Sequence, residues 1–345
     1  MWRNIAAGIA LFLICTITGV ARADERNLKR FEFSEPHMGT SFRLVLFAET
    51  QAEAKQAART AFARVTELDN CLSDYKPTSE LMQLCQKAGG APAPVSDDLF
   101  RVLEYAQKVS AMSNGAFDVS VGSLTKLWRL ARRTHQMPDP EKLATARGLV
   151  GYQNIKLDAK NRTVQLLKPG MQLDLGGIAK GYSGDAVLET LAKMKITHVL
   201  LAAGGDITVG DPPPGSKGWV IGIAPLDDPK KTPSRFLMLA NQAVSTSGDA
   251  EQYVEIGGKR YSHIVDPHTG LGLVGRTSAT VVARHGIQSD SLTKTIAVLG
   301  PERGLKIIDG VEGAVALLVR KTDRGEEEVF TSKRFDAVTQ QKTKP

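Results

Sequence analysis

Hydrophobic and polar positions repeat with two different periods along this chain of 345 residues. Apolar residues three or four positions apart, as at Ala57, Ala61, Val65 and Leu68, indicate one buried face of a helix. Alternation with period two, or a short apolar run between turn residues, indicates a strand. The predicted helices span 52–72, 80–86, 96–112, 140–150 and 185–194, and another helix opens at 289–294. The predicted strands form a pair in 31–47, interrupted by Met38-Gly39-Thr40, and a hairpin in 155–167. Further strands are predicted at 198–202, 279–283, 314–319 and 328–331.

No stretch of the sequence has the composition of a linker between domains. It contains no serine- and glycine-rich tract, low-complexity segment or internal repeat, and the proline-rich run 211–215 is typical of a loop between strands. The length allows one large domain or two ordinary ones. Because helices and strands are intermixed, we predict one large mixed α+β domain with two lobes over 24–335, followed by a lysine-rich tail, 336–345, that we expect to be disordered.

The first 23 residues have the pattern of a secretory signal peptide. Arg3 precedes an apolar run over 5–20, and Ala21-Arg22-Ala23 supplies a cleavage site before an acidic pair. The apolar run is short for a membrane-spanning helix, and its downstream flank is polar. We therefore predict cleavage after Ala23 and export, without a lipid anchor, to the periplasm or another extracytoplasmic compartment.

The charge of the chain does not indicate a nucleic-acid partner. The formal net charge is +7, and loss of Arg3 and Arg22 with the signal peptide lowers it by two, to +5. The basic residues are scattered, and aromatic residues are not interleaved with them as in nucleic-acid-binding surfaces. We predict a solvated surface and no nucleic-acid binding.

Two cysteines, Cys71 and Cys85, remain after signal cleavage. An oxidising compartment would permit a disulfide between them. Their positions in two apolar-periodic segments also fit two small buried residues that do not pair. Both interpretations stay open, because spacing in sequence does not fix a distance. A metal site is not expected, since no histidine lies near them.

The stretch from Leu173 to Asp185 has the clearest chemical pattern. An aspartate between leucines leads into Gly176-Gly177, then Lys180, and a helical pattern follows, so we predict a strand, a tight turn and a helix start. Bare glycine backbone, the free NH groups that open a helix and a lysine together suit an anion. The stretch therefore predicts a phosphate-binding loop, although its spacing is neither that of a P-loop nor GxGxxG.

Glycines beside carboxylates or hydroxyls recur later in the chain. Gly204-Gly205-Asp206 follows a predicted buried strand, and the run from Ser245 to Asp249 repeats the pattern with hydroxyls. His263 and Asp266 come after a hairpin turn, and together they are better acid–base candidates than either alone. The repetition exceeds what turn formation requires and predicts one composite site.

Three further residues each have two interpretations. Asp118, expected on a strand, either binds a ligand or caps the local backbone. Tyr75, beside a loop, either stacks on a flat ligand or packs against protein. Asp290 is either a helix N-cap, worth roughly 1 kcal/mol, or a ligand for a hard cation with Thr293 or Thr295 supplying further oxygen.

Taken in order, these blocks resemble the ApbE family, the FAD:protein FMN transferases. The resemblance runs from about Phe33 to about Val319 and implies a domain of the T-fold-like type found in this family. The blocks that carry it are Met38-Gly39-Thr40, Phe117-Asp118, the stretch from Asp174 to Tyr182, Gly204-Gly205-Asp206, Ser245 to Asp249, His263 to Gly270 and Asp290 to Lys294.

The resemblance implies an exported, magnesium-dependent enzyme that splits the pyrophosphate of FAD. FMN would pass to a threonine or serine hydroxyl of an exported or membrane redox protein, such as a subunit of a membrane electron-transfer complex, and AMP would be released. Two alternatives are an FAD pyrophosphatase, in which water replaces the hydroxyl, and a periplasmic flavin-binding protein without turnover. The acceptor and the oligomeric state do not follow from the sequence.

Residue by residue, the resemblance implies specific roles. Asp290 and His263 are the expected catalytic residues, Asp290 as metal ligand and possible base, and His263 as the group that positions the acceptor or phosphate. Lys294 stands where the family often has a threonine, so either Thr293 takes that ligand's place or Lys294 replaces part of the metal's charge. The expected FAD contacts are Met38, Tyr75, Asp118, Lys180, Gly205, Asp206, Thr246 and His263, and the expected magnesium ligands are the Ala179 main-chain oxygen, Asp290 and Thr293.

Overall fold

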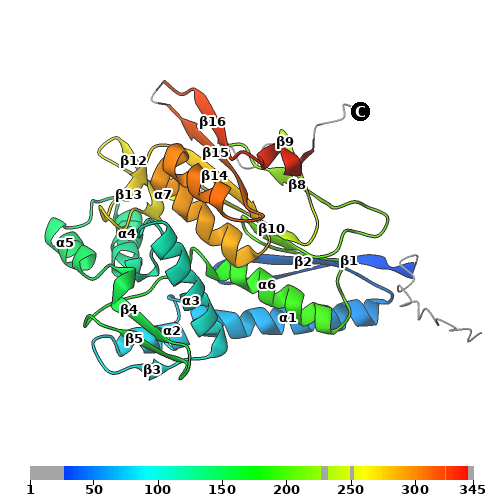
Figure 1. Cartoon of the computed structure of the whole chain (residues 1–345), viewed down its shortest axis with the longest axis horizontal. Coiled ribbons are helices and arrows are strands. Elements are labelled where there is room, and N and C mark those ends of the chain that lie inside the picture. Colours follow the sequence, from blue (N-terminus) through cyan, green and yellow to red (C-terminus); the bar gives the residue numbers. More distant parts are fainter. Residues whose placement is uncertain (1–26, 227–231, 249–251, 323, 341–345) are drawn as a thin grey trace, which may run out of the picture.

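An eight-stranded antiparallel sheet forms the centre of the molecule (Figure 1). The computed structural model describes residues 27–226, 232–248, 252–322 and 324–340. The sheet has the order β1-β2-β6-β7-β10-β14-β15-β16, and every neighbouring pair is antiparallel. These strands are, in the same order, Lys29–His37, Thr40–Ala48, Val199–Ala203, Asp206–Val209, Gln242–Gly248, Thr277–Ala283, Val315–Lys321 and Glu327–Thr331.

Three helices cover one face of this sheet: α1 (Gln51–Leu72), α6 (Ala179–Lys193) and α7 (Gly286–Gly310). Alternate residues of each strand face them, as the period of two in a pleated strand requires. Leu44 of β2 packs with α1 and α6, whereas its neighbour Val45 belongs to the core on the opposite face. In Figure 1, α1 and α6 run along the β1–β2 half and α7 along the β14–β15 half.

A smaller sheet covers the opposite face. It has the order β17-β9-β8, formed by Thr339–Gln340, Arg235–Leu239 and Trp219–Ile223. Ile221 and Leu237 pack there against apolar residues of the main sheet. The main sheet is therefore buried on both faces over much of its length, which accounts for the nearly continuous apolar runs of its central strands.

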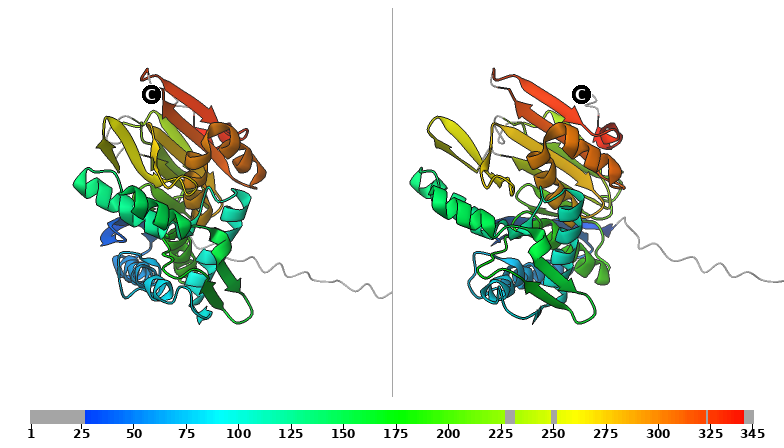
Figure 2. Two further views of the ribbon diagram at one scale, coloured as in Figure 1. Left: turned by 90° about the vertical axis from the view of Figure 1, so that its left-hand side faces the viewer. Right: turned by 60° about the vertical axis from the view of Figure 1, so that its left-hand side comes forward.

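The second lobe is built from the segments between α1 and α6, together with a three-stranded sheet from later in the chain. Figure 2 shows the segments 80–86 and 155–166 of this lobe at the lower end of the molecule, and the strands 315–321 and 327–331 of the main sheet at its upper end. Its helices are α2 (Glu80–Gln86), α3 (Asp97–Met112), α4 (Gly122–Thr134) and α5 (Pro140–Gly148), and its strands are β3 (Ala93–Pro94), β4 (Ile155–Asp158), β5 (Thr163–Leu166), β11 (Tyr253–Ile256), β12 (Lys259–Val265) and β13 (Gly272–Val274). Short 3₁₀ helices at Val119–Val121, Tyr152–Asn154 and Phe335–Val338 complete the described chain.

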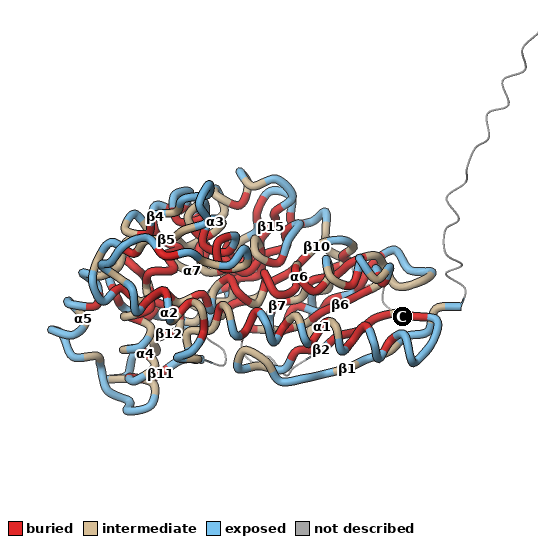
Figure 3. The backbone as a smooth tube through the Cα atoms, turned by 90° about the horizontal axis from the view of Figure 1, so that it is seen from below, coloured by how far each residue is buried: buried red, intermediate tan, exposed pale blue. Residues whose placement is uncertain are grey.

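Burial is greatest where the layers meet (Figure 3). The tube is mostly buried along α6, β6 and β7, and mostly exposed along α5 and the outer strand β1. In the described residues, no helix has the length and apolar character needed to cross a bilayer. The two glycine- and carboxylate-rich blocks of the sequence, 174–185 and 204–206, lie at the start of α6 and between β6 and β7.

Most predicted elements are confirmed, as are the mixed α+β class and the two lobes. The strand pair around Met38-Gly39-Thr40, the hairpin in 155–167, the hairpin turn at Gly257-Gly258 and the predicted helices all form. The elements α4, β7, β8, β9, β10 and β13 have no counterpart among the predictions.

Three local predictions are wrong. Leu173-Asp174-Leu175 pairs with no strand of the described chain, because its backbone bonds to a 3₁₀ helix: the NH of Asp174 donates to the Val119 carbonyl at 2.8 Å. Asp118 is not on a strand but caps the 3₁₀ helix after it. Asp290 is not an N-cap, because α7 begins one turn earlier, with His285 and Gln288 forming a capping box.

The two cysteines are free, so the interpretation without a disulfide is the correct one. The Cys71 thiol donates to a Glu80 carboxylate oxygen at 3.1 Å, and burial raises the pKa of this thiol to about 12. Cys85 is buried and its sulfur accepts from the NH of Leu173 at 3.3 Å. Both thiols are thereby kept protonated and unreactive at neutral pH.

The predicted signal peptide, 1–23, lies outside the described residues, and its cleavage stays a prediction. Of the tail expected to be disordered, 336–340 form the end of a 3₁₀ helix and β17, and 341–345 lie outside the described residues. The domain limits 24–335 likewise stay a prediction.

Candidate active site

A cavity of about 1130 Å³ opens where the main sheet, the start of α6 and the second lobe meet. This volume exceeds the ~300–1,000 Å³ of pockets for drug-sized ligands, so the cavity has room for a larger molecule. Among the residues predicted from the sequence, those that line it are Met38, Tyr75, Asp118, Ala179, Lys180, Gly205, Asp206, Thr246 and His263. Asp290 and Thr293 are fully buried and are not part of its wall, whereas Lys294 of the same helix is.

Two glycines bring α6 and α7 into direct backbone contact beside the cavity. A Cβ atom on Gly181 would lie 2.0 Å from the Gly286 carbonyl oxygen, and one on Gly286 would lie 2.2 Å from the Gly181 oxygen. No residue larger than glycine fits either place without displacing a helix. The close approach lets the NH of Gly181 donate to Oδ2 of Asp290 at 3.1 Å.

The β6–β7 turn delivers a carboxylate to the cavity. Gly204 has φ +63°, and a Cβ atom on Gly205 would lie 2.5 Å from the Thr246 carbonyl oxygen. The Gly205 carbonyl accepts from the NH of Thr246 at 2.8 Å, while the Thr246 hydroxyl contacts that of Thr280 at 2.9 Å. The predicted Gly-Gly-Asp block is thus a tight turn whose backbone lies against β10 and whose Asp206 begins the next strand.

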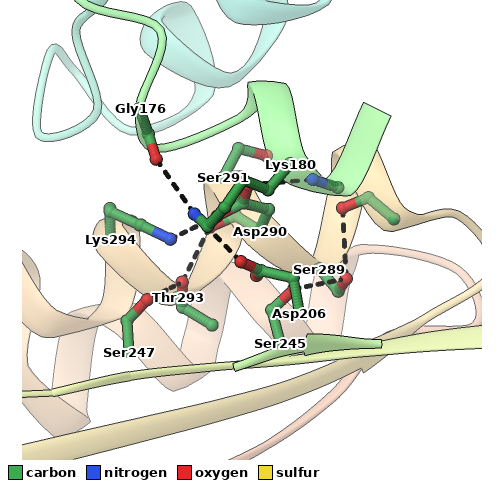
Figure 4. A network of polar contacts seen from close by, with 12 residues as sticks. Gly176, Lys180, Asp206, Ser245, Ser247, Ser289, Asp290, Ser291, Thr293 and Lys294 are labelled. Atoms are coloured by element: carbon green, nitrogen blue, oxygen red, sulfur yellow. Dashed lines mark hydrogen bonds and ion pairs between the residues drawn. The ribbon is translucent and has the colours of Figure 1, made fainter. Parts of the chain in front are cut away.

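Lys180 reaches from the first turn of α6 to Asp206 (Figure 4). Its Nζ lies 3.0 Å from Oδ2 of Asp206 and donates to the Gly176 carbonyl at 3.3 Å. Burial alone would lower the pKa of Lys180, but Asp206 and Asp290 outweigh burial and raise it, so the ammonium stays charged. The other oxygen of Asp206, Oδ1, is buried and has no hydrogen-bond partner in the described part of the chain. A buried carboxylate oxygen without a donor is suited to accept a hydrogen bond from a ligand.

Lys294 forms an ion pair with Asp290 one turn earlier on α7 (Figure 4). Nζ of Lys294 contacts Oδ1 of Asp290, whose side chain is 0% exposed. Burial would raise the pKa of Asp290, but Lys294 and Lys180 outweigh it and the net shift is downward. Asp290 is therefore an ionised carboxylate that contacts Lys294 and one backbone NH and is further stabilised by the charge of Lys180.

The expected magnesium ligands already have partners within the protein. The Ala179 carbonyl accepts from the Ser183 hydroxyl at 2.8 Å, and the Thr293 hydroxyl lies 3.0 Å from Ser247 Oγ and 2.7 Å from the Asp290 carbonyl. No three carboxylate, imidazole or thiol side chains of the described residues gather as a metal site. A divalent ion about 4 Å from one ammonium would be repelled by roughly 8 kcal/mol at an effective dielectric constant near 20. These residues do not fit a resident magnesium ion while Lys294 contacts Asp290.

His263 is held as a neutral imidazole. Its Nδ1 lies 3.1 Å from the Gln252 carbonyl, which requires the proton on Nδ1 and leaves the lone pair on Nε2. Burial lowers the pKa of His263 to about 4; the Gln252 contact opposes this, and Lys294, Arg132 and Lys180 lower it further. At pH 7 the side chain is thus a proton acceptor in the cavity wall.

Tyr75 presents an aromatic face to the cavity. The side chain is 72% exposed, and the guanidinium of Arg129 lies 4.1 Å from the ring centroid. Arg129 also contacts Asp74 at 2.5 Å and Asp174 at 2.8 Å, and the two carboxylates come from segments a hundred residues apart in sequence. Arg129 therefore fixes the loop carrying Tyr75 to the stretch that precedes α6.

The contacts that Asp118 makes within the protein are structural. Met38 lies in the cavity wall, in a turn where its φ is positive. Asp118 accepts from the NH and hydroxyl of Ser120 and from the NH of Tyr152, and burial raises its pKa. Met38 has φ 47°, and its sulfur accepts from the Ser183 hydroxyl at 3.6 Å. The capping interpretation of Asp118 is therefore correct, while its contact with a ligand stays a prediction.

Sequence reasoning missed Arg129 and Arg132, which line the cavity from α4. A signal was present, because Leu124, Trp128 and Ala131 have helical spacing and would have predicted α4. With α4 predicted, Arg129 would have been a candidate to stack on the ring of Tyr75.

The chain matches the model of the ApbE family over residues 38–319. It is 31% identical over 293 residues to a protein of Klebsiella pneumoniae named FAD:protein FMN transferase, covering 84% of this chain and 89% of that one. A protein of the same name from Haemophilus influenzae is 30% identical over 312 residues, covering 88% of this chain and 90% of the other.

Solved structures give the same relationship. The flavin transferase ApbE from Vibrio cholerae superposes with a TM-score of 0.81 at 27% identity, covering 90% of this chain and 99% of that one. The ApbE protein of Thermotoga maritima superposes with a TM-score of 0.80 at 27% identity, covering 91% of this chain and 100% of that one. The similarity thus spans both lobes and the cavity between them.

Proposed function

The chain belongs to the ApbE family and is an FAD:protein FMN transferase, and we propose that the cavity described above binds FAD and carries out the transfer. FMN is moved onto a threonine or serine hydroxyl of an exported or membrane redox protein, and AMP is released. The observation that carries this assignment is the convergence of charge and an aromatic face in one large cavity: Lys180, Lys294, Asp206, His263 and Tyr75 all line it.

The cavity offers distinct contacts for each part of FAD. The open face of Tyr75 suits the flat isoalloxazine, since aromatic rings favour offset stacking. The unpartnered Oδ1 of Asp206 accepts from a sugar or ribityl hydroxyl. The ammonium groups of Lys180 and Lys294 line the cavity near the start of α6, and their charge suits the pyrophosphate of FAD.

The transfer is an in-line substitution at the FMN phosphorus. The acceptor oxygen forms a bond to this phosphorus while the bond to the bridging oxygen breaks, and that oxygen leaves as part of AMP. Ammonium groups neutralise charge on the departing phosphate, and a fixed FAD holds the phosphorus in line with the hydroxyl. The hydroxyl proton goes to a base, so atoms and charge balance.

We assign the base to His263. Its Nε2 carries a free lone pair at neutral pH, and its ring lies in the cavity wall. The other candidate from the sequence, Asp290, has no exposed surface and is paired with Lys294, so it positions the lysine instead of meeting the acceptor. General-base catalysis is worth roughly 100-fold to 10,000-fold, and His263→Gln should lower kcat within that range.

The family resemblance implies magnesium dependence. A bound Mg²⁺ would supply charge neutralisation at the pyrophosphate. Because Ala179, Asp290 and Thr293 do not fit the ion in the observed arrangement, we derive no step through a resident metal.

Export is a further part of the proposal. The sequence pattern of residues 1–23 supports cleavage after Ala23 and a site of action in the periplasm or another extracytoplasmic compartment. The acceptor would then be an exposed segment of an exported or membrane-bound redox protein.

The test separates transfer from its two alternatives. The protein lacking residues 1–23 is incubated with FAD and a serine- or threonine-containing acceptor peptide, and products are measured by mass spectrometry and nucleotide chromatography. We expect peptide carrying FMN and an equal amount of AMP, and no labelling of the peptide with alanine at the acceptor position. Free FMN and AMP at the same rate without peptide would identify a pyrophosphatase, and tight FAD binding without AMP would identify a carrier.

A further inference from the structure

The cation beside the buried carboxylate of this site is already built into α7. Asp290 and Lys294 are four residues apart and share one face of the helix, and Nζ of Lys294 contacts Oδ1 of Asp290 (Figure 4). A buried carboxylate requires a partner of opposite charge. Lys294 supplies it from within the same helix turn.

The lysine is held in place along its whole length. A Cβ atom on Gly177 would lie 3.4 Å from Cγ and 3.5 Å from Cε of Lys294, so the stem lies directly over the bare backbone of the glycine pair. The side chain is only 15% exposed, and the part that remains exposed lines the cavity. Its position is therefore fixed by packing as well as by charge.

The second oxygen of Asp290 is also occupied. Oδ2 accepts from the NH of Gly181, and Lys180 adds a second positive charge to the same carboxylate. The Thr293 hydroxyl is fully buried and already bonds to Ser247 Oγ, at 3.0 Å, and to the Asp290 carbonyl, at 2.7 Å. A divalent ion placed at Asp290 would meet the charge of two ammonium groups, and no three carboxylate, imidazole or thiol side chains of the described residues gather there to hold it.

We propose that the ammonium group of Lys294 is the resident cation of this site, which excludes a divalent ion from Asp290 and acts in its place on the pyrophosphate. An ammonium has three N–H donors on a compact charge, so Lys294 can bond to Asp290 and a phosphate oxygen at once. The action on pyrophosphate rests on the proposed function, whereas the exclusion of metal does not.

Metal binding is measured first, on the FAD-free protein, by electron paramagnetic resonance of added Mn²⁺, which takes the same oxygen ligands as Mg²⁺. We expect no tight Mn²⁺ site in the unmodified chain and a gain of at least tenfold in Mn²⁺ affinity in Lys294→Ala. Lys306→Ala, an exposed lysine later on α7, is the matched control and should behave as the unmodified chain. One Mn²⁺ bound per unmodified chain, and lost in Asp290→Asn, would overturn the proposal even if Lys294→Ala fails to fold.

Transfer is measured second, with the acceptor peptide and an excess of chelator. We expect the unmodified chain to keep its rate within about twofold, while Lys294→Ala loses transfer in chelator and recovers it with Mg²⁺. A fall of more than tenfold in the unmodified chain, reversed by Mg²⁺, would overturn the substitution of lysine for metal. Absence of transfer under every condition would count against the proposed function alone, because the Mn²⁺ measurement does not depend on it.

Discussion

His263 combines a fixed tautomer with a suppressed positive charge. The Gln252 carbonyl fixes the proton on Nδ1, and burial with nearby cations lowers the pKa to about 4. The same environment that makes the residue a free base at neutral pH also makes its protonation costly. Function and acid sensitivity therefore have one physical cause at this residue.

This cause predicts the pH dependence of folding. The pKa of His263 is lowered in the folded chain, so the unfolded chain binds the proton first as the pH falls. The contribution of His263 to the free energy of unfolding is therefore present above pH 6.5 and is lost as the pH falls toward 4. A pKa lowered from 6.5 to about 4 corresponds to roughly 3 kcal/mol between those limits. Urea unfolding at pH 7 and pH 4.5 should show a smaller loss of stability in His263→Gln than in the unmodified chain.

A suitable control for this experiment is His135→Asn. His135 is exposed at the end of α4 with φ 54°, a backbone conformation that asparagine tolerates. The control should follow the pH profile of the unmodified chain. Identical profiles for His263→Gln and the unmodified chain would show that the environment of His263 does not oppose its protonation.

At the scale of elements, the contact between α6 and α7 decides the geometry of the charged cluster. α6 carries Lys180 and α7 carries Asp290 and Lys294, and the two helices meet through Gly181 and Gly286 without side chains between them. A small change in helix separation would move one lysine relative to the carboxylate. The glycines therefore set the distances of the site from outside the cavity.

Gly181→Ala tests this contact. The new Cβ atom would lie 2.0 Å from a backbone oxygen, so the helices must separate, and overpacking of this kind costs about 1–3 kcal/mol. We expect that loss in urea unfolding together with at least tenfold slower transfer. Gly148→Ala, at the end of α5 with nothing within 4 Å, should change neither stability nor transfer appreciably. Normal transfer in a destabilised Gly181→Ala protein would separate helix packing from catalysis.

Arg129 links three segments through one guanidinium, and its replacement should weaken both folding and FAD binding. Arg129→Met leaves Asp74 and Asp174, with side chains 5% and 9% exposed, without their shared partner. Breaking such a buried pair costs about 3–5 kcal/mol. Loss of the stacked platform under Tyr75 should weaken FAD binding by roughly threefold to tenfold, measured by fluorescence titration.

Arg129→Lys distinguishes charge from shape. Lysine keeps the positive charge but cannot bond two carboxylates as a planar fork or stack on the ring. We expect stability between those of the unmodified chain and Arg129→Met, with FAD affinity as weak as in Arg129→Met. Unchanged FAD affinity in both variants would mean that Tyr75 does not depend on Arg129 for its position.

The elements that local patterns predict correctly are those whose burial follows one period, such as α1, α3 and the β1–β2 pair. Leu173-Asp174-Leu175 alternates like a strand, yet no neighbouring strand offers it hydrogen bonds, and a partner cannot be deduced from the pattern of a single segment. A composite site was predicted because glycines beside carboxylates recur in the sequence, whereas individual roles such as those of Met38 and Thr246 came from the family resemblance. The contacts within the site were not predicted, since the Asp290–Lys294 pair depends on where α7 begins and on how closely α6 approaches.

At the scale of the whole molecule, the cavity is shared between two lobes with separate hydrophobic cores. Tyr75 and Arg129 belong to the lobe of α2–α5, while Gly205, Asp206 and Thr246 belong to the main sheet and its β6–β7 turn. A ligand that contacts both groups must hold the lobes together. Binding energy then appears as resistance to local opening on both sides of the cavity.

FAD binding should therefore protect two separate sets of backbone amides in hydrogen-exchange mass spectrometry. We expect slower exchange around Tyr75 and in α4, and at the same time around 204–206 and 244–248. At a concentration 100 times its Kd, FAD should add about 2.7 kcal/mol to the free energy of unfolding. AMP and FMN alone contact only part of the cavity, so each should protect fewer segments than FAD. Protection by FAD that stays within one lobe would show that the nucleotide does not bridge them, and the assignment of Tyr75 and Asp206 to one ligand would be wrong.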